Sequence, residues 1–339
     1  MKKILIITDA WYPQVNGVVT VMNNIMIQLT SRGFDVVVVH PGLFLSRPFP
    51  LYPEVPLVLF PGKKMEKLFL KEKPDYVHIA TEWTLGMSAR AYCFRKGIPF
   101  TTSYHTNFPL YVSHYFPFGK KILASLAYRY MRWFHSPARA TLVSTKTLKE
   151  ELEHAGFQHI TLWSFGLDIE FFKRNTLVPS SELPSPVFVY FGRCAKEKGI
   201  EEYLKLTLPG TKLVIGDGPL RKELEKKYGA SAIFVGYKRG QELIDALSVC
   251  DVCVFPSRTE TFGLVVIEAL ALGLPVAAHN VMGPRDIISS GVDGILSEDL
   301  EIAAKECLLL SREKCREKAL QFSWERSADI FIKAFEETI

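Results

Sequence analysis

The 339-residue sequence lacks several features that define whole classes of protein. No apolar run approaches the ~18 residues that a membrane-spanning helix needs. The N-terminal segment MKKILIITDA has only four consecutive aliphatic residues before Thr8, too few for the apolar region of a signal peptide. These absences predict a cytoplasmic protein that begins with a β-strand.

Cysteine is also sparse, with six residues in the whole chain. One Cys-x₂-Cys spacing joins Cys250 and Cys253, and the sequence supplies neither a second pair nor closely spaced His ligands to complete a zinc site. We therefore expect no metal here. The pair is typical of an apolar strand in which cysteine acts as a small hydrophobic residue.

Two ligand-binding motifs are missing as well. No Gly-x-Gly-x-x-Gly is present, so the dinucleotide-binding fingerprint fails. The chain also has no Asp-x-Asp, the motif with which metal-dependent transferases hold a diphosphate. Any diphosphate chemistry must then depend on the cations and helix N-termini of the protein itself.

The net charge of +5 hides an asymmetry. Residues 1–167 carry 19 Lys and Arg against 10 Asp and Glu, whereas the rest of the chain has 22 against 26. The basic residues of the first half form two groups, which are Lys63, Lys64, Lys67, Lys71 and Lys73, and then Lys120, Lys121, Arg129 and Arg132.

Aromatic residues are interleaved with the second basic group, namely Tyr115, Phe116, Phe118, Tyr128, Tyr130, Trp133 and Phe134. Basic residues mixed with aromatics suit an anionic membrane surface. Solvated charges with aromatics that face a core are the alternative. The sequence contains no nucleic-acid-binding motif, so we expect no nucleic-acid partner.

Short aliphatic strands alternate with helical stretches along the whole chain, which predicts an α/β protein with two doubly wound parallel sheets in tandem. The predicted strands are KKILIITD, DVVVVH, DYVHIA, PFTTSYH and ATLVST, and then VFVYFG, KLVIGDG, AIFVG, VCVFPS and LPVAAH. A polar, Pro/Ser-rich segment at 173–186 is the predicted linker. We expect a first domain at 1–170, a second at 171–321, and an amphipathic C-terminal helix at 322–339 that packs on the first domain.

Ligands of open α/β sheets bind beyond the carboxyl ends of the strands, so the residues that follow strands carry most information. In the first half, Gly17 opens a helix after the first strand and His105 ends another strand. In the second half, Arg193 and Lys198 follow one strand, beside glycines that permit a tight turn.

The segment from Phe255 to Val276 is the most informative part of the sequence. A buried-strand pattern is followed by a Thr-Phe-Gly turn and then by an apolar helix, with Glu260 before the turn and Glu268 eight residues later. A helix start offers free N–H groups to an anion. Carboxylates accept hydrogen bonds from sugar hydroxyls. Two unrelated solvated glutamates are the alternative interpretation.

Together these segments fit the departure of a nucleoside diphosphate from a sugar, in which negative charge develops on the diphosphate. The motifs GRCAKEKG, GDGP, FVGY, ETFGLVVIE, ALGLPV, SGVDGIL and FSWE resemble the donor-binding half of retaining glycosyltransferases of family 4, which have the GT-B fold. The first-half motifs YPQVNGV, PDYVHIATE, LGMSAR, PFTTSYHTNFPLYV and FGLDIEFF are similar to the branch with GDP-mannose-dependent α-mannosyltransferases and glycolipid-forming relatives.

The resemblance implies two Rossmann-like domains that face a cleft, with an acceptor in the first and a nucleotide-sugar donor in the second. It implies that Arg193 and Lys198 bind the diphosphate and Glu268 binds the ribose. It further implies that Glu260 holds the transferred sugar. The remaining implied contacts are the backbone N–H groups of Phe262, Gly263 and Leu264 on sugar and phosphate, His105 near the reacting carbon, and Gly17 over the phosphates.

We therefore predict a retaining, metal-independent hexosyltransferase without a cofactor, at the inner face of the cytoplasmic membrane. Mannose from GDP-mannose is the favoured donor, and a lipid or a glycan is the acceptor. The alternatives are a UDP-sugar-dependent glycolipid synthase that uses glucose, galactose or sulfoquinovose, a sugar-nucleotide epimerase of the same fold, and an inactive binding protein. Candidate acceptor-site residues are those that follow first-half strands, which are Glu82, Trp83, Tyr104 and Asn107.

Overall fold

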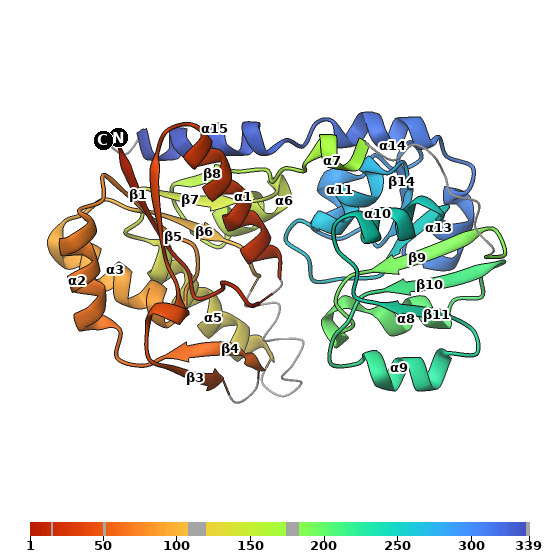
Figure 1. The fold of residues 1–339 in the computed structure, drawn as a ribbon, viewed down its shortest axis with the longest axis horizontal. Coiled ribbons are helices and arrows are strands. Elements are labelled where there is room, and N and C mark those ends of the chain that lie inside the picture. The colour runs from red at the N-terminus through yellow and green to blue at the C-terminus, as the bar shows by residue number, and fades with distance from the viewer. Residues whose placement is uncertain (15, 50–51, 108–119, 174–182, 337–339) are drawn as a thin grey trace. The chain divides into compact units, whose positions relative to one another are not determined.

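A computed structural model describes residues 1–14, 16–49, 52–107, 120–173 and 183–336. The chain forms two compact units, one made of Met1–Gly166 with Trp324–Ile339 and the other of Leu167–Ser323. Each unit contains one six-stranded sheet (Figure 1). The chain passes between the units at 166–167 and at 323–324. The predicted linker at 173–186 does not coincide with either boundary, and its residues 174–182 lie outside the described residues.

The sheet of the first unit is parallel throughout, in the order β2-β1-β5-β6-β7-β8. Its strands are β1 (Lys3–Ile7), β2 (Asp35–Val39), β5 (Tyr76–Ile79), β6 (Thr101–Tyr104), β7 (Ala140–Val143) and β8 (Ile160–Leu162). A separate antiparallel pair joins β3 (Ser46–Phe49) to β4 (Tyr52–Val58). The helices are α1 (Gly17–Ser31), η1 (Pro41–Leu43), α2 (Gly62–Glu72), α3 (Thr84–Lys96), α5 (Lys120–His135), α6 (Lys146–His154) and α15 (Trp324–Glu336).

Both faces of this sheet are covered, which explains why its strands are apolar at consecutive positions. Leu5 and Ile7 of β1 belong to a core with side chains of α2, α3 and α5. On the other face, the ring of His78 lies 4.7 Å from that of Phe331 in α15. His78 is satisfied by Thr101 and Ser103 and is a core residue.

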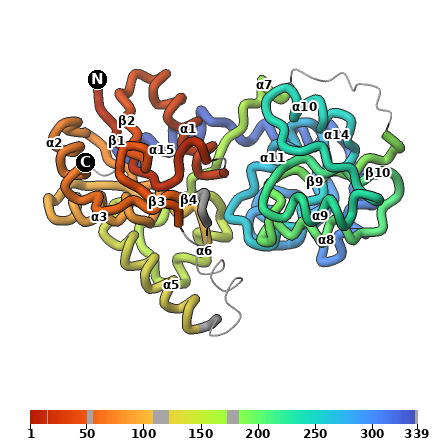
Figure 2. The backbone as a smooth tube through the Cα atoms, turned by 60° about the horizontal axis from the view of Figure 1, so that its bottom comes forward, coloured from red at the N-terminus to blue at the C-terminus, as the bar shows by residue number. Residues whose placement is uncertain are grey.

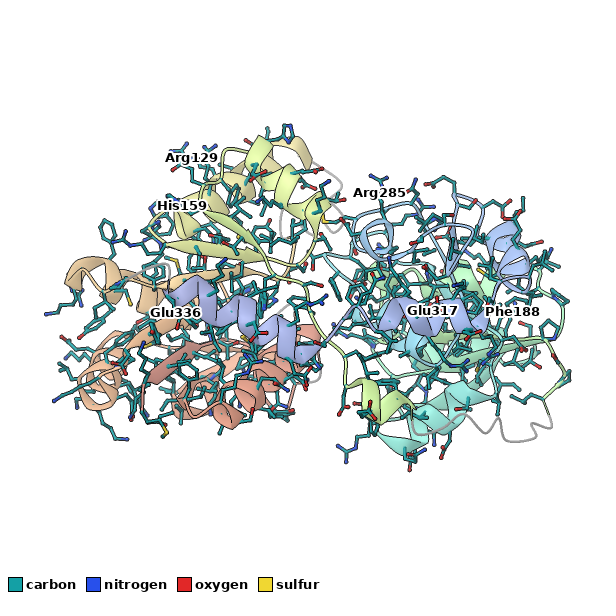
Figure 3. The ribbon with its side chains drawn as sticks, turned by 90° about the horizontal axis from the view of Figure 1, so that it is seen from above. Arg129, His159, Phe188, Arg285, Glu317 and Glu336 are labelled. Atoms are coloured by element: carbon teal, nitrogen blue, oxygen red, sulfur yellow. The ribbon has the colours of Figure 1, made fainter. Side chains whose placement is uncertain are left out.

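The C-terminal helix α15 packs on the first unit, against α1. Figure 3 shows it lying over this unit with Glu336 at its end. Its buried positions include Trp324, Ala328 and Phe331, which recur on one face at helical spacing. Two polar contacts fix its register, because Trp163 donates to the Ser327 carbonyl at 3.0 Å and Arg32 pairs with Asp329.

The second unit repeats the architecture with the strand order β11-β10-β9-β12-β13-β14, again parallel. Its strands are β9 (Val187–Phe191), β10 (Thr211–Ile215), β11 (Ile233–Gly236), β12 (Val252–Phe255), β13 (Val276–Ala278) and β14 (Gly294–Leu296). The helices are α7 (Ile169–Lys173), η2 (Lys196–Lys198), α8 (Ile200–Lys205), α9 (Arg221–Tyr228), α10 (Gln241–Ser248), α11 (Leu264–Ala271), α12 (Pro284–Ile287), α13 (Leu300–Cys307) and α14 (Arg312–Ala319).

Its core lies on both sides of β9, whose five residues are all buried. Phe188 and Tyr190 face α8, α9 and α13, and Phe188 lies within the unit in Figure 3. Helix α11 packs against β13 and against α14. Cys253 lies within β12 and Cys250 precedes it, both buried with free thiols, as expected for an apolar strand.

The prediction of two doubly wound parallel sheets is confirmed, and each of the ten predicted strands is present. The sequence analysis missed β8, β14 and the β3–β4 hairpin. β8 and β14 are edge strands of three residues, too short for a periodic pattern to emerge. In the hairpin, Pro48, Pro53 and Pro56 concealed the strand signal.

Candidate functional site

The chain reverses its direction of winding across the second sheet between β9 and β12. Strands β10 and β11 were added on one side of β9, and β12, β13 and β14 on the other. The loops that leave the carboxyl ends of β9 and β12 therefore diverge, and such a switch point leaves a crevice for a ligand. Every charged donor-site residue predicted in the second half follows β9 or β12.

One ion pair connects the two loops at this switch point. Lys198 Nζ lies 2.5 Å from Glu260 Oε1, with side chains 33% and 13% exposed. Lys198 ends the short helix η2 that follows β9, whereas Glu260 follows β12. The structure thus brings together two predicted site residues that are 62 positions apart in the sequence. Neither group is sealed from solvent, so a ligand can reach both.

Backbone contacts hold the two loops in register. The Glu197 carbonyl accepts hydrogen bonds from Ser257 Oγ at 3.4 Å and from Thr259 Oγ1 at 3.1 Å. Gly199 has a φ of +66°, and a Cβ there would lie 2.7 Å from the Pro256 carbonyl oxygen. Only glycine permits this approach without strain. The position of Lys198 is therefore fixed by the fold and not by its ion pair alone.

Arg193 lies at the other end of the same loop and is partly exposed. Its guanidinium is 3.7 Å from the buried Glu197 carboxylate, and its backbone carbonyl accepts from Tyr190 Oη at 2.7 Å. The Tyr190 bond anchors the backbone to the strand end. Arg193 and Lys198 thus emerge from one rigid turn, in which a fork-shaped and a point-like cation can meet the oxygens of one diphosphate.

The second loop ends at α11, where Gly263 adopts a left-handed φ of +97° as the N-cap residue. This turn exposes the first N–H groups of the helix, including that of Leu264, beyond the strand ends. The Phe262 side chain is buried, so its contribution to a ligand would come from the backbone.

Glu268 lies in the second turn of α11 among apolar side chains. Burial raises the pKa of its carboxyl to about 7. No side chain within the described ranges donates a hydrogen bond to it or pairs with it. A desolvated carboxyl without a protein partner can accept hydrogen bonds from vicinal hydroxyls, which is the role the resemblance implies.

In the first unit, Gly17 is the first residue of α1, whose N-cap Asn16 accepts a hydrogen bond from the Val19 N–H at 3.0 Å. A Cβ at Gly17 would meet nothing within 4 Å. Packing within the described part of the chain therefore does not require a glycine here.

His105 follows β6, as predicted, and its imidazole lies beside the rings of Trp163 and Phe165. Its Nε2 is 2.8 Å from Ser103 Oγ. Burial lowers the pKa of His105 to about 3, so the ring is neutral at neutral pH. A neutral imidazole can hydrogen-bond a sugar hydroxyl. It cannot act as a general acid, because it lacks the additional proton of the imidazolium.

Asp9 was missed by the sequence analysis, although it also follows a strand. The first sheet reverses its winding between β1 and β5, and Asp9 lies at that point, buried. Its carboxylate accepts from Thr81 Oγ1 at 2.9 Å and from the backbone N–H of Leu85 at 2.9 Å at the start of α3. Asp9 therefore caps α3 and fixes the loop that contains Glu82.

The four acceptor-site candidates have different environments. Glu82 and Trp83 line a pocket of about 460 Å³. Tyr104 is 1% exposed and belongs to the core. Asn107 is buried and donates to the Glu151 carboxylate at 3.1 Å. Of the four, the first two are positioned to contact a ligand.

The basic and aromatic region separates into inward and outward residues on α5. Phe134 is fully buried, whereas Tyr128 and Tyr130 are half-buried and donate hydrogen bonds to Glu151 and to the Glu82 carbonyl. For these three residues the structure therefore agrees with the alternative interpretation, in which the aromatics face the core. Residues 115, 116 and 118 lie outside the described residues.

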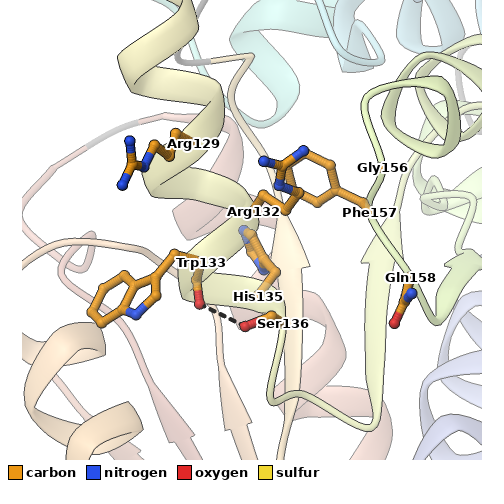
Figure 4. A pocket seen from close by; sticks show the side chains of 8 residues that line it. All are labelled: Arg129, Arg132, Trp133, His135, Ser136, Gly156, Phe157 and Gln158. Carbon is orange, nitrogen blue, oxygen red and sulfur yellow. Dashed lines mark hydrogen bonds between the residues drawn. The ribbon is translucent and has the colours of Figure 1, made fainter.

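The solvent face of α5 exposes two aliphatic residues that the sequence analysis did not name and one aromatic residue that it did. Ile122, Leu126 and Trp133 are 69%, 56% and 47% exposed, at spacings that place them on one helix face. The described cations of this face are Arg129 and Arg132. They line a pocket of about 320 Å³ with Trp133, Ser136 and Gln158. In Figure 4, Arg132 reaches toward Phe157 and Arg129 points away from it.

Helix α5 contains no acidic residue. Figure 2 shows it at the periphery of the first unit. No helix of the described part of the chain is both long and apolar enough to cross a bilayer.

Comparisons with known proteins agree with the motifs. The family model described as Glycosyltransferase Family 4 matches residues 15–171, and the one described as Glycosyl transferases group 1 matches residues 173–323. The sulfoquinovosyl transferase SQD2 of Arabidopsis thaliana is 31% identical over 86% of this chain and 62% of its own length. A GDP-mannose-dependent α-mannosyltransferase of Mycobacterium tuberculosis is 30% identical over 87% of this chain and 83% of its own length.

The chain thus spans less than two thirds of the plant relative. Among solved structures, sucrose-phosphate synthase from Thermosynechococcus elongatus matches with a TM-score of 0.76 at 18% identity, over 99% of both chains. This likeness confirms the predicted GT-B fold.

Proposed function

The chain belongs to the glycosyltransferases of family 4, and from that membership we propose that it moves a hexose from a nucleotide sugar to a lipid acceptor with retention of configuration. Mannose from GDP-mannose is the favoured donor sugar. The observation that supports a donor site most strongly is the Lys198–Glu260 pair across the switch point of the second sheet.

The proposal assigns each member of that pair to one part of the donor. In the free protein, the ammonium of Lys198 and the carboxylate of Glu260 neutralise each other at 2.5 Å. On binding, the diphosphate replaces Glu260 as the ion-pair partner of Lys198. A hydroxyl of the transferred sugar then donates a hydrogen bond to Glu260. The exchange leaves neither charge unpaired, so donor binding avoids most of the desolvation cost of separating an ion pair.

The reaction breaks the bond between the anomeric carbon and the diphosphate oxygen. It forms a bond from that carbon to the acceptor oxygen, whose proton passes to the departing diphosphate. Arg193, Lys198 and the N-terminus of α11 stabilise the charge that develops on the diphosphate, in place of a metal ion. The neutral His105 hydrogen-bonds the sugar. Glu268 holds the ribose.

The choice of GDP-mannose draws support from the mycobacterial relative and from the first-half motifs. A UDP-sugar donor is the second candidate, because the plant relative bears the name sulfoquinovosyl transferase. The two relatives are almost equally identical to this chain. The donor must therefore be identified by competition between nucleotide sugars.

A lipid acceptor is supported by the outer face of α5. Exposed Ile122, Leu126 and Trp133 beside Arg129 and Arg132 suit the interface of an anionic bilayer, where each basic residue contributes about 1 kcal/mol. These features support a location on a membrane surface.

The test is to incubate the protein in EDTA with GDP-mannose, UDP-glucose or UDP-galactose and a lipid extract, and to analyse all products. The proposal predicts a glycolipid and free nucleoside diphosphate, with GDP-mannose the best donor. A nucleotide sugar converted without any acceptor would identify an epimerase. Turnover that requires added divalent metal would contradict the metal-free assignment.

A further inference from the structure

We propose that His279 is a positioning residue of the donor site, which acts through Glu202 while its ring carries two protons. Through that contact it holds the segments of Lys198 and Glu260 in place. The proposal rests on the proposed function and adds a pH-sensitive residue to its donor site. His279 directly follows β13, and it is the only histidine in the sequence of the second unit.

Both ring nitrogens of His279 face acceptors. Its Nε2 lies 3.0 Å from Glu202 Oε1, and its Nδ1 lies 3.2 Å from the carbonyl oxygen of Ser297. The side chain is fully buried, so bulk water cannot take the place of either partner. A carbonyl and a carboxylate only accept hydrogen bonds. Each ring nitrogen must therefore carry a proton for both contacts to be hydrogen bonds, which makes the ring an imidazolium.

Neither neutral form of the ring satisfies this geometry. With the proton on Nε2, the lone pair of Nδ1 would point at the Ser297 carbonyl. With the proton on Nδ1, the lone pair of Nε2 would point at the Glu202 carboxylate. In either case two acceptors face each other, and a buried acceptor is left unsatisfied. Removal of the second proton as pH rises should therefore loosen the contact.

The charged groups around the ring come from three further segments. Glu202 lies in α8, Glu298 lies between β14 and α13, and Arg258 follows β12. The guanidinium of Arg258 is 2.9 Å from the Glu298 carboxylate and 3.6 Å from that of Glu202. The pKa of the Glu298 carboxyl is lowered mainly by Arg258 and, to a smaller extent, by the nearby His279. Two carboxylates and one guanidinium thus surround the ring, so a second ring proton makes the group neutral overall.

Glu202 connects this group to Lys198. It lies in the first turn of α8, where its backbone N–H donates to the Gly199 carbonyl at 2.8 Å. Gly199 is the N-cap residue of α8 and directly follows Lys198. When His279 holds the Glu202 side chain, it also fixes the turn from which the Lys198 ammonium extends.

The segment of Glu260 is connected to the same group from two sides. Arg258, two residues before Glu260, lies against the Glu202 carboxylate. The loop that begins at His279 also packs on Glu260, because a Cβ at Gly283 would lie only 3.1 Å from the Glu260 Cβ. A displaced His279 ring would therefore disturb both members of the ion pair at the switch point.

The protonation of the ring can be measured in the full chain by NMR. In protein labelled with ¹⁵N-histidine, the shifts of the ring nitrogens distinguish an imidazolium from either neutral form. His279→Gln identifies the signals of His279, because they disappear from the spectrum of the variant. We expect both ring nitrogens of His279 to be protonated at pH 6 and one proton to be lost as the pH is raised.

Donor binding is measured by calorimetric titration with GDP and with UDP, at pH 6 and at a pH at which the ring has become neutral. His279→Gln keeps a hydrogen-bond donor but removes the charge. For the nucleotide that the wild type binds, we expect the variant to raise Kd about threefold or more at pH 6 and to match the wild type at the higher pH. Glu268 titrates in the same range in both proteins, so the ratio of the two Kd values removes its contribution.

Glu202→Gln tests the same contact from the other side. It should cause a similar loss of affinity at pH 6, and the double variant with His279→Gln should lose little more, because both changes remove one interaction. Glu202 is partly exposed, so this variant also tests the proposal if His279→Gln does not fold. Glu223→Gln, exposed on α9 of the same unit, is the matched control and should leave Kd unchanged.

A singly protonated ring at pH 6, or a ratio of Kd values that is the same at both pH values, would overturn the proposal. Fully additive losses in the double variant would do the same. If His279→Gln lowers Tm but binds nucleotide as the wild type does, His279 is a structural residue only. Failure of the wild type to bind either nucleotide would contradict the proposed function, whereas the NMR titration would still decide whether the ring is charged.

Discussion

Replacing Glu268 with Gln should make the second unit more stable at alkaline pH and should weaken its binding of the nucleotide sugar. Burial raises the pKa of Glu268 from 4.5 to about 7, and no side chain among the described residues compensates for it. The folded state therefore holds the proton more tightly than the unfolded state does. Below pH 4.5 both states are protonated, and as pH rises to 7 the wild type loses stability because ionisation favours the unfolded chain.

The magnitude follows from the two pKa values. The full difference corresponds to about 3 kcal/mol, at about 1.4 kcal/mol for each tenfold change in proton affinity. Because Glu268 is partly exposed, screening reduces this figure, and we expect Glu268→Gln to gain about 2 kcal/mol on the wild type between pH 5 and pH 8. For a unit of this size that gain corresponds to a rise of about 4–8 °C in Tm.

Calorimetry is the suitable assay, because all five tryptophans lie in the first unit and tryptophan fluorescence does not report on the second. Glu223→Gln, exposed on α9, is the control for removing one carboxylate from the same unit. The gain should vanish at low pH and should be accompanied by weaker nucleotide-sugar binding. A stability difference that is the same at pH 5 and pH 8 would refute the burial argument.

Three further predictions concern the rest of the site. Lys198→Met should weaken nucleoside diphosphate binding about tenfold or more. Glu260→Gln should leave that affinity intact or raise it, and should instead reduce sugar transfer. Equal losses of diphosphate affinity in a binding titration of the two variants would contradict the division of roles. Gly17→Ala should not lower Tm, because its Cβ faces open space, but should impair donor turnover; unchanged turnover would remove Gly17 from the site. Leu126→Glu on α5 should reduce sedimentation with anionic vesicles at low salt without changing nucleotide affinity, and undiminished sedimentation would exclude this face as the membrane contact.

Much of the fold was predictable because both sheets are buried on both faces. Strands such as β1 and β9 then consist of uninterrupted apolar residues between polar turns, which is a strong local signal. The edge strands β8 and β14 bury less and are shorter, so their sequences carry little pattern.

The residues of the candidate donor site could be predicted from the sequence, but their arrangement in space could not. Their positions after strands indicated which edge of the sheet they occupy. The strand order was needed to see that the loops of Lys198 and Glu260 meet at the switch point. The desolvation of Glu268 depends on the packing of α11 and has no counterpart in local sequence.

Features that depend on tertiary contacts were missed. Asp9 looked like an ordinary residue after a strand, although its carboxylate caps a helix that begins 75 residues later. The aromatic residues of α5 looked equivalent in the sequence, and only their position around the helix separates buried Phe134 from exposed Trp133.

The central claim is that the second unit supplies a metal-free donor site for hexose transfer to a lipid. The most direct measurement is the rate of glycolipid formation from GDP-mannose in EDTA, for the wild type and for Lys198→Met. We predict glycolipid and free GDP from the wild type, with the rate reduced at least about tenfold in the variant. Equal rates in the two proteins, or no glycolipid from any nucleotide sugar offered, would contradict the account.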